Sequence, residues 1–172
     1  MAQSVIEGYL RWLEYESDAH AWVLNSMETV PEERRGSPEF RRAVSILAHV
    51  VLARRIWLAR LGAAPAPPAS AGTLFPEDAE VERVAADWHD VRSLWFAYLR
   101  GLDDAALDRE VEYRSLDGKR FRNRVRDILD QLYGHSWYHR GQIAMLLRAA
   151  GGQPAMTDLI YWSREALPDS EA

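Results

Sequence analysis

Two histidines stand four residues apart in the segment GHSWYHRGQ, residues 134–142. If this segment is helical, His135 and His139 project from the same face, one turn apart. Such a pair directs two imidazole lone pairs toward one point, as Zn–N bonds of about 2.0–2.1 Å require. The pair alone does not distinguish a metal site from two histidines that are hydrogen-bonded within a core.

A third histidine strengthens the metal interpretation. The apolar stripe of residues 128–146 passes through His135 and His139, so both are predicted to face inward. His49 occupies the same kind of position on the apolar stripe of residues 46–60. Three inward histidines from two helices would leave coordination positions open for water or substrate. A set of buried histidines bonded to carboxylates or backbone carbonyls remains the alternative.

Other nucleophilic chemistries are excluded by residue content. The chain has no cysteine, so a thiolate nucleophile, a cysteine-based zinc site and disulfides are ruled out. Positions 136–138 are Ser, Trp and Tyr, so the general-base glutamate of an H-E-x-x-H peptidase is missing. Imidazoles accept several divalent ions. We expect zinc or nickel, with iron or manganese as alternatives.

Long amphipathic helices must position these side chains. Spacings of three and four between apolar residues predict four helices, and Ser37-Pro38 is a typical helix start. Asp117-Gly118 between short alternating runs predicts a small β-hairpin before the last helix. The segment TDLIYW is expected to lie back over the bundle. The predicted architecture is an all-α, up-down four-helix bundle with a crossover linker, in one domain (1–172): helices 4–29, 38–62, 77–102 and 123–150, and a Pro/Ala-rich linker at 62–76.

Composition limits the partners. The chain has 172 residues, is 48% hydrophobic and includes seven Trp and seven Tyr, which suits one domain with a large core. The net charge of −5 argues against nucleic acid and anionic membranes as partners. The N-terminal residues show no signal-peptide pattern, and the most apolar helix carries three arginines. We therefore expect a soluble, cytoplasmic protein.

Several segments together resemble the DinB family of helical bundles: SILAHVVLARRIWLARL, YGHSWYHRGQIAMLLRAAGGQPAMTDLIYW and the linker ending FPED. In that family a helix-two histidine and an H-x-x-x-H-R-G-Q motif form a metal triad. The resemblance thus implies that His49, His135 and His139 are metal ligands. Relatives include transferases and isomerases that use a low-molecular-weight thiol. The family often has Asn where this chain has His20, which is either a polar group near the metal or, as we expect, a residue at the bundle rim.

Further residues are candidates for substrate binding or for supporting the ligands. Gln142 and Arg140 flank the second ligand of the motif, and Arg140 is expected to point away from the stripe and pair with a tail carboxylate such as Asp158. The aromatic residues Trp57 and Tyr138 are mainly core or interface candidates, with a substrate cleft as the alternative. His89 is expected at the surface.

Five cations fill residues 119–126, where they face the positive end of the last helix. This suggests a compensating anion, and Arg122 and Arg124 would meet the carboxylates of a thiol if the hairpin lies near the site. A solvated charged surface is the alternative.

The functional prediction is a divalent-metal-dependent enzyme that activates a small thiol or water, of the transferase or hydrolase kind. The alternative is a non-catalytic, metal-binding or structural bundle, with a stress-related role. In both cases the tryptophan-rich surface and apolar tail predict a homodimer.

Overall fold

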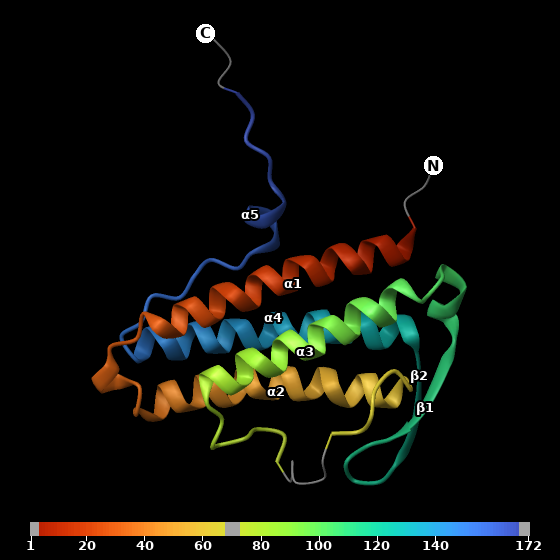
Figure 1. Ribbon diagram of the computed structural model, residues 1–172, viewed down its shortest axis with the longest axis horizontal. Coiled ribbons are helices and arrows are strands. Elements are labelled where there is room, and N and C mark those ends of the chain that lie inside the picture. The colour runs from red at the N-terminus through yellow and green to blue at the C-terminus, as the bar shows by residue number, and fades with distance from the viewer. Residues whose placement is uncertain (1–3, 68–72, 169–172) are drawn as a thin grey trace.

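The computed structural model describes residues 4–67 and 73–168 and forms a four-helix bundle (Figure 1). The predicted β-hairpin is present before the last long helix, and its strands pair antiparallel. A short helix follows in the C-terminal tail. The bundle and its hairpin thus confirm the predicted fold class. The elements are α1 (Val5–Glu28), α2 (Pro38–Arg60), α3 (Val81–Arg100), β1 (Glu110–Arg114), β2 (Arg120–Arg124), α4 (Val125–Ala149) and α5 (Leu159–Ser163), with 3-10 turns η1 (Glu32–Arg34) and η2 (Asp104–Asp108).

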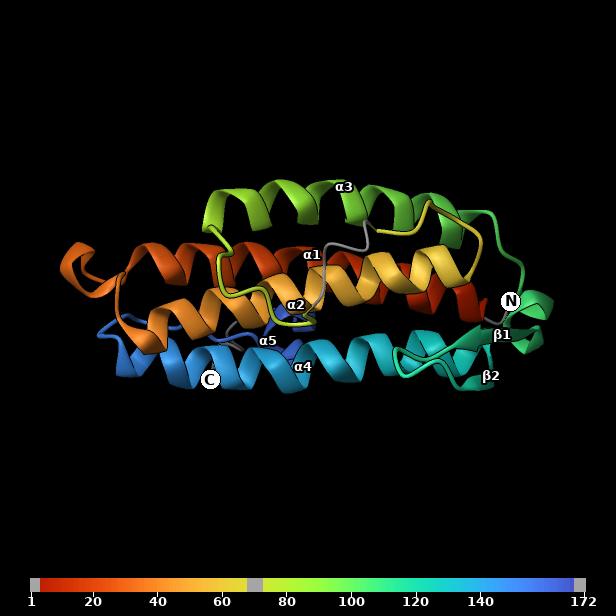
Figure 2. The same ribbon diagram turned by 90° about the horizontal axis from the view of Figure 1, so that it is seen from below.

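The helix directions differ from a simple up-down bundle. Helices α2 and α3 run in the same direction, since α2 ends and α3 begins at opposite ends of the bundle (Figures 1 and 2). Each of α1 and α2 packs against both α3 and α4. Helix α4 therefore has two buried faces, one toward α1 and one toward α2. The predicted crossover connection is therefore present, and the up-down order predicted with it was wrong, because two helices joined by a crossover run in the same direction.

Local signals fix where the elements begin and end. Ser37 caps α2 by accepting a hydrogen bond from the backbone N–H of Phe40 at 3.3 Å, and Pro38 takes the first helical position. Gly118 has a φ of 82°, in the left-handed region that the hairpin turn requires. These predicted signals place the start of α2 and the hairpin turn within a residue or two of their observed positions.

The core is continuous along the bundle. Large side chains from all four helices are fully buried, including Leu13, Leu58, Trp95 and Ile128. A continuous core of this kind holds the helices in fixed register, which a site built from several helices needs. No helix among residues 4–67 and 73–168 is long and apolar enough to cross a membrane.

The C-terminal tail lies back along α1, as predicted. The backbone N–H of Ala155 donates to Ser26 Oγ at 2.9 Å, and the Trp162 indole donates to Asp18 Oδ2 at 2.7 Å. The apolar residues of α5 are only partly covered, since Ile160 and Tyr161 remain exposed. The tail is thus anchored by polar contacts and leaves apolar surface beside α4.

Candidate metal centre

The three predicted histidines converge between α2 and α4. His49 Nε2 and His139 Nε2 each lie 3.1 Å from His135 Nε2, and all three donor atoms lie within 4.8 Å of one another. Metal–nitrogen bonds of about 2.1 Å place neighbouring donors about 3.0 Å apart at right angles and about 3.4 Å apart at tetrahedral angles. Both separations from His135 fall in that interval. The geometry is compatible with one divalent ion bound through the three Nε2 atoms.

The outer ring nitrogens of two histidines have fixed partners. His49 Nδ1 lies 2.8 Å from the backbone carbonyl oxygen of Leu74, and His139 Nδ1 lies 2.7 Å from Gln142 Oε1. Each of these oxygens is an acceptor, so each Nδ1 carries the proton and each Nε2 presents its lone pair. These contacts also orient the rings, which is the usual role of the partners of metal-binding histidines.

With both Nδ1 atoms protonated, the three Nε2 atoms at the centre of the triad cannot all be satisfied by hydrogen bonds to one another. His135 Nε2 faces two lone pairs at 3.1 Å, and a neutral imidazole has one proton to donate at most. A proton on His135 Nε2 can satisfy only one of these two acceptors, so at least one Nε2 lone pair has no donor. A divalent cation among the three Nε2 atoms would accept all of their lone pairs, so the donor set fits a metal better than it fits a hydrogen-bonded core.

All three imidazoles are kept neutral by their surroundings. Burial lowers the pKa of His135 to about 4, with further lowering by His139 and His49. Burial also lowers the pKa of His49 and of His139. Because a histidine must be neutral to bind a metal, these shifts reduce proton competition at neutral pH.

The crossover linker covers one side of the triad. Leu74 supplies the acceptor for His49, and the Phe75 ring stacks on the His49 ring with centroids 4.0 Å apart. The guanidinium of Arg42 also lies over the Phe75 ring, with its Cζ 4.5 Å from the ring centroid. The linker is therefore part of the site and not only a connection between helices.

The larger cavities of the described residues lie elsewhere. One of about 430 Å³ lies between α2 and α3 and is lined by Arg55 and Asp87. Another, of about 530 Å³, lies between α2 and the hairpin and is lined by Trp57, Tyr113 and Phe121. Size alone does not identify a site here, whereas the converging nitrogens do.

A buried ion cluster connects the helices behind the triad. The carboxylate of Glu16 on α1 is completely buried and pairs with Arg54 of α2 at 2.7 Å and with Arg140 of α4. Arg54 also donates to Ser136 Oγ at 3.1 Å, and Arg140 donates to Tyr15 Oη at 2.8 Å. Burial by itself raises the pKa of Glu16, but the two guanidiniums outweigh it and the pKa is lowered. The cluster holds one negative and two positive charges.

The expected position of Arg140 was wrong. Arg140 is buried, points toward α1 and pairs with Glu16, not with Asp158. The reason is that α4 has two buried faces, one carrying His139 and the next, one residue further around the helix, carrying Arg140. Sequence reasoning missed Glu16 and Arg54 altogether, although Glu16 occupies a buried position on α1 between Leu13 and His20.

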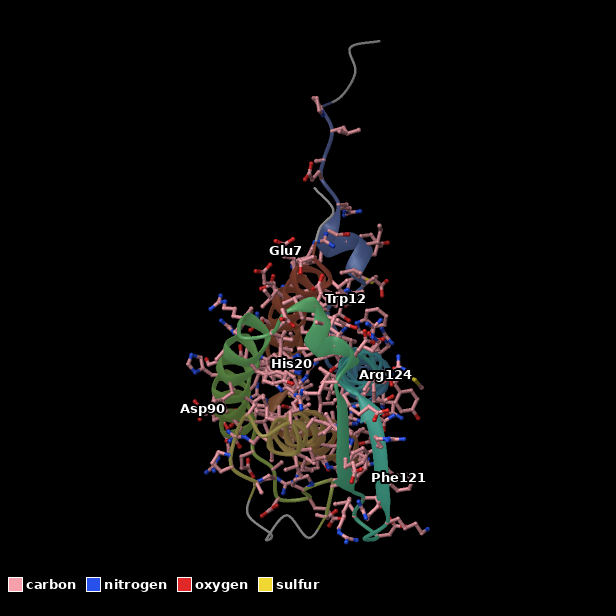
Figure 3. The ribbon with its side chains drawn as sticks, turned by 90° about the vertical axis from the view of Figure 1, so that its right-hand side faces the viewer. Glu7, Trp12, His20, Asp90, Phe121 and Arg124 are labelled. Atoms are coloured by element: carbon pink, nitrogen blue, oxygen red, sulfur yellow. The ribbon has the colours of Figure 1, made fainter. Side chains whose placement is uncertain are left out.

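His20 lies inside the bundle and not at its rim (Figure 3). Its ring stacks on Trp88 at 3.8 Å, and its Nδ1 lies 2.9 Å from the backbone carbonyl oxygen of Glu16. Its Nε2 has no hydrogen-bond partner among the described residues, and burial lowers its pKa to about 4. His20 is not one of the three histidines that converge.

The basic hairpin residues have internal partners. Arg122 pairs with Glu110 at 3.0 Å, and Arg124 pairs with Asp108 at 3.5 Å. At the start of α4, Asp127 Oδ2 accepts a hydrogen bond from the backbone N–H of Arg124 at 3.2 Å. Arg124 precedes His135 by 11 residues, or about 16 Å of helix. Figure 3 shows Arg124 on the hairpin side of the bundle. The placement favours the charged-surface alternative over thiol binding by these two residues.

The other residues predicted as site candidates do not all lie at the triad. Gln142 contacts the ligand His139, as expected of a supporting residue. Tyr138 is exposed, with its ring 5.1 Å from that of His139. Trp57 packs on Tyr113 at 4.9 Å, in the hairpin cavity two turns beyond His49. His89 is at the surface, as expected.

A family model described as the DinB superfamily matches residues 34–143. The match spans α2, α3, the hairpin and most of α4, and so includes all three converging histidines. It leaves out α1, which supplies Glu16 to the buried ion cluster. The comparisons with curated proteins and with solved structures gave no match.

Proposed function

The chain belongs to the DinB superfamily, and from this membership and the triad we propose that it is a divalent-metal-dependent enzyme whose ligands are His49, His135 and His139. The observation that carries the proposal is that His49 Nε2 and His139 Nε2 each lie 3.1 Å from His135 Nε2, while the outer Nδ1 atoms of His49 and His139 lie against acceptor oxygens. A bound divalent ion lowers the pKa of a coordinated thiol or water and so supplies a nucleophile at neutral pH. Zinc or nickel suits three imidazoles, with iron or manganese as alternatives.

The chain's own residues then have positioning roles. Leu74 O and Gln142 Oε1 hold the proton of His49 and His139 on Nδ1, which keeps both Nε2 atoms available. Phe75 shields one face of His49 from water. The cluster of Glu16, Arg54 and Arg140 fixes α1, α2 and α4 relative to one another behind the ligands.

A small thiol is the proposed activated group, with water as the second candidate. The absence of cysteine means that a thiol nucleophile has to come from outside the chain. The test is to load the protein with cobalt(II) and titrate 2-mercaptoethanol. We expect a sulfur-to-cobalt charge-transfer band that saturates and that is lost in His135→Ala.

The outcomes separate the alternatives. A His89→Ala variant is the control, because His89 is exposed and far from the triad in sequence, and its band should match that of the wild type. If thiols leave the cobalt spectrum unchanged while azide alters it, the proposal that the metal activates a thiol is refuted. Activation of water, as in a hydrolase, is then favoured. If neither alters it, the metal has no open position and a structural role is favoured.

We also propose that the protein is a homodimer. Large apolar side chains are exposed on the outer face of α4 and on the adjacent tail: Trp137, Tyr138, Met145, Ile160 and Tyr161. Trp137 and Leu159 line the same cavity, which connects the helix and the tail into one surface. A second copy of the chain would cover this surface, and contiguous apolar surface on a folded domain commonly marks such an interface.

A further inference from the structure

The Phe75 ring contacts both His49 of the triad and the exposed side chain of Arg42. Phe75 stacks on His49 with ring centroids 4.0 Å apart, and Arg42 Cζ lies 4.5 Å from the centroid of the same Phe75 ring. Together these distances place the guanidinium within about 9 Å of the His49 ring. Arg42 precedes His49 by two helical turns and so lies on the same face of α2.

Arg42 also has hydrogen-bonding capacity to spare. Among the described residues no ion pair or hydrogen bond involves its guanidinium, whereas the adjacent Arg41 pairs with Glu80 at 3.7 Å. The other two arginines near the ligands, Arg54 and Arg140, are buried and share Glu16. A guanidinium that lies over a ring still directs its N–H donors outward in its own plane, which suits a carboxylate.

From this geometry we infer that Arg42 binds a carboxylate of the substrate while the reacting end of the same molecule lies at the triad. Arg42 is then a specificity-determining residue, and the preferred substrates are small carboxylates whose charged end reaches a guanidinium no more than about 9 Å from the His49 ring. The inference rests on the proposed function, because the triad fixes where the reacting end lies.

The test uses hydroxamates, which bind a metal with open positions whether or not the protein uses thiols. Three probes of equal length are titrated into cobalt(II)-loaded protein and followed by the cobalt absorption spectrum. They are adipic acid monohydroxamate, its terminal primary amide and 6-aminohexanohydroxamic acid. At low salt the wild type should bind the carboxylate probe about two- to fivefold more tightly than the amide, because an exposed charge-assisted contact is worth up to about 1 kcal/mol.

Two substitutions at Arg42 and one at its neighbour make the test specific. Arg42→Met should abolish the preference for the carboxylate, and Arg42→Glu should favour the amine probe. Arg41→Met is the matched control, since Arg41 is equally a helix-surface arginine but is paired with Glu80, and it should retain the wild-type preference. The preference should also shrink as salt is added, because the charges are exposed to solvent.

The possible failures are distinguishable. If cobalt binds but the wild type does not discriminate between carboxylate and amide, or if Arg42→Met keeps the preference, the role of Arg42 is refuted and the metal centre is unaffected. If the protein does not bind cobalt, the proposed function is refuted and the role of Arg42 with it.

Discussion

Removing the negative charge of Glu16 is expected to destabilise the bundle strongly. Glu16 is completely buried and is the carboxylate shared by Arg54, at 2.7 Å, and Arg140. In Glu16→Gln the shape is kept, but two guanidiniums remain buried without a counter-ion. Breaking a buried ion pair in this way costs about 3–5 kcal/mol. Since domains of this kind have about 5–15 kcal/mol of unfolding free energy, the variant should be close to its folding limit.

Urea denaturation of the metal-free protein, followed by circular dichroism, measures this effect. Glu110→Gln is the matched control, because Glu110 pairs with Arg122 at 3.0 Å on the exposed hairpin. It should lower the free energy of unfolding by less than about 1 kcal/mol. Replacing Glu16, Arg54 and Arg140 together by methionine should recover much of the loss, because no buried charge is then left unpaired.

The pH dependence has a definite sign. The pKa of Glu16 is lowered in the folded state, so its contribution to stability is complete above the ordinary value of 4.5 and is lost as pH falls through the lower folded-state pKa. Glu16→Gln should lack this part of the acid sensitivity. If Glu16→Gln destabilises no more than Glu110→Gln, the cluster does not depend on the Glu16 charge and the reasoning is refuted.

Three further predictions concern the ligands, the core and the surface. Gln142→Leu removes the acceptor of the His139 Nδ1 proton, so it should weaken metal binding about ten- to hundredfold in a chelator competition assay, and unchanged affinity would contradict the role. His20 has a folded-state pKa of about 4 against an ordinary value of 6.5, so the wild type loses stability as pH falls through that interval, and His20→Phe should lose less when measured by urea denaturation. Light scattering should give a dimer mass for the wild type and a monomer mass for Tyr138→Asp/Met145→Asp, whereas a monomeric wild type would refute the homodimer.

Periodicity predicted the helices and the triad well because both depend on local spacing. The four-residue step from His135 to His139 places both on one face whatever the tertiary structure. The position of His49 on its own apolar stripe then pointed to the facing helix. The hairpin was predicted as reliably, since Asp117-Gly118 supplies the left-handed residue that its turn requires.

The buried charges were not predictable in the same way. Arg54 and Arg140 have the residue type of exposed positions, and their burial depends on Glu16, which comes from a distant helix. The crossover between α2 and α3 was predicted, but the contacts of its residues were not, so the stacking of Phe75 on His49 did not follow from sequence. Arg42 was missed for that reason, since its connection to the site runs through Phe75.

Metal stoichiometry of the purified and reconstituted protein tests the metal centre most directly. Measured by inductively coupled plasma mass spectrometry after incubation with zinc or nickel and removal of excess ion, the wild type should hold one ion per chain. His49→Ala, His135→Ala and His139→Ala should each lose most of it while keeping wild-type helicity, and His89→Ala should keep it. If all three single variants retained one ion per chain, the triad would not be the metal site.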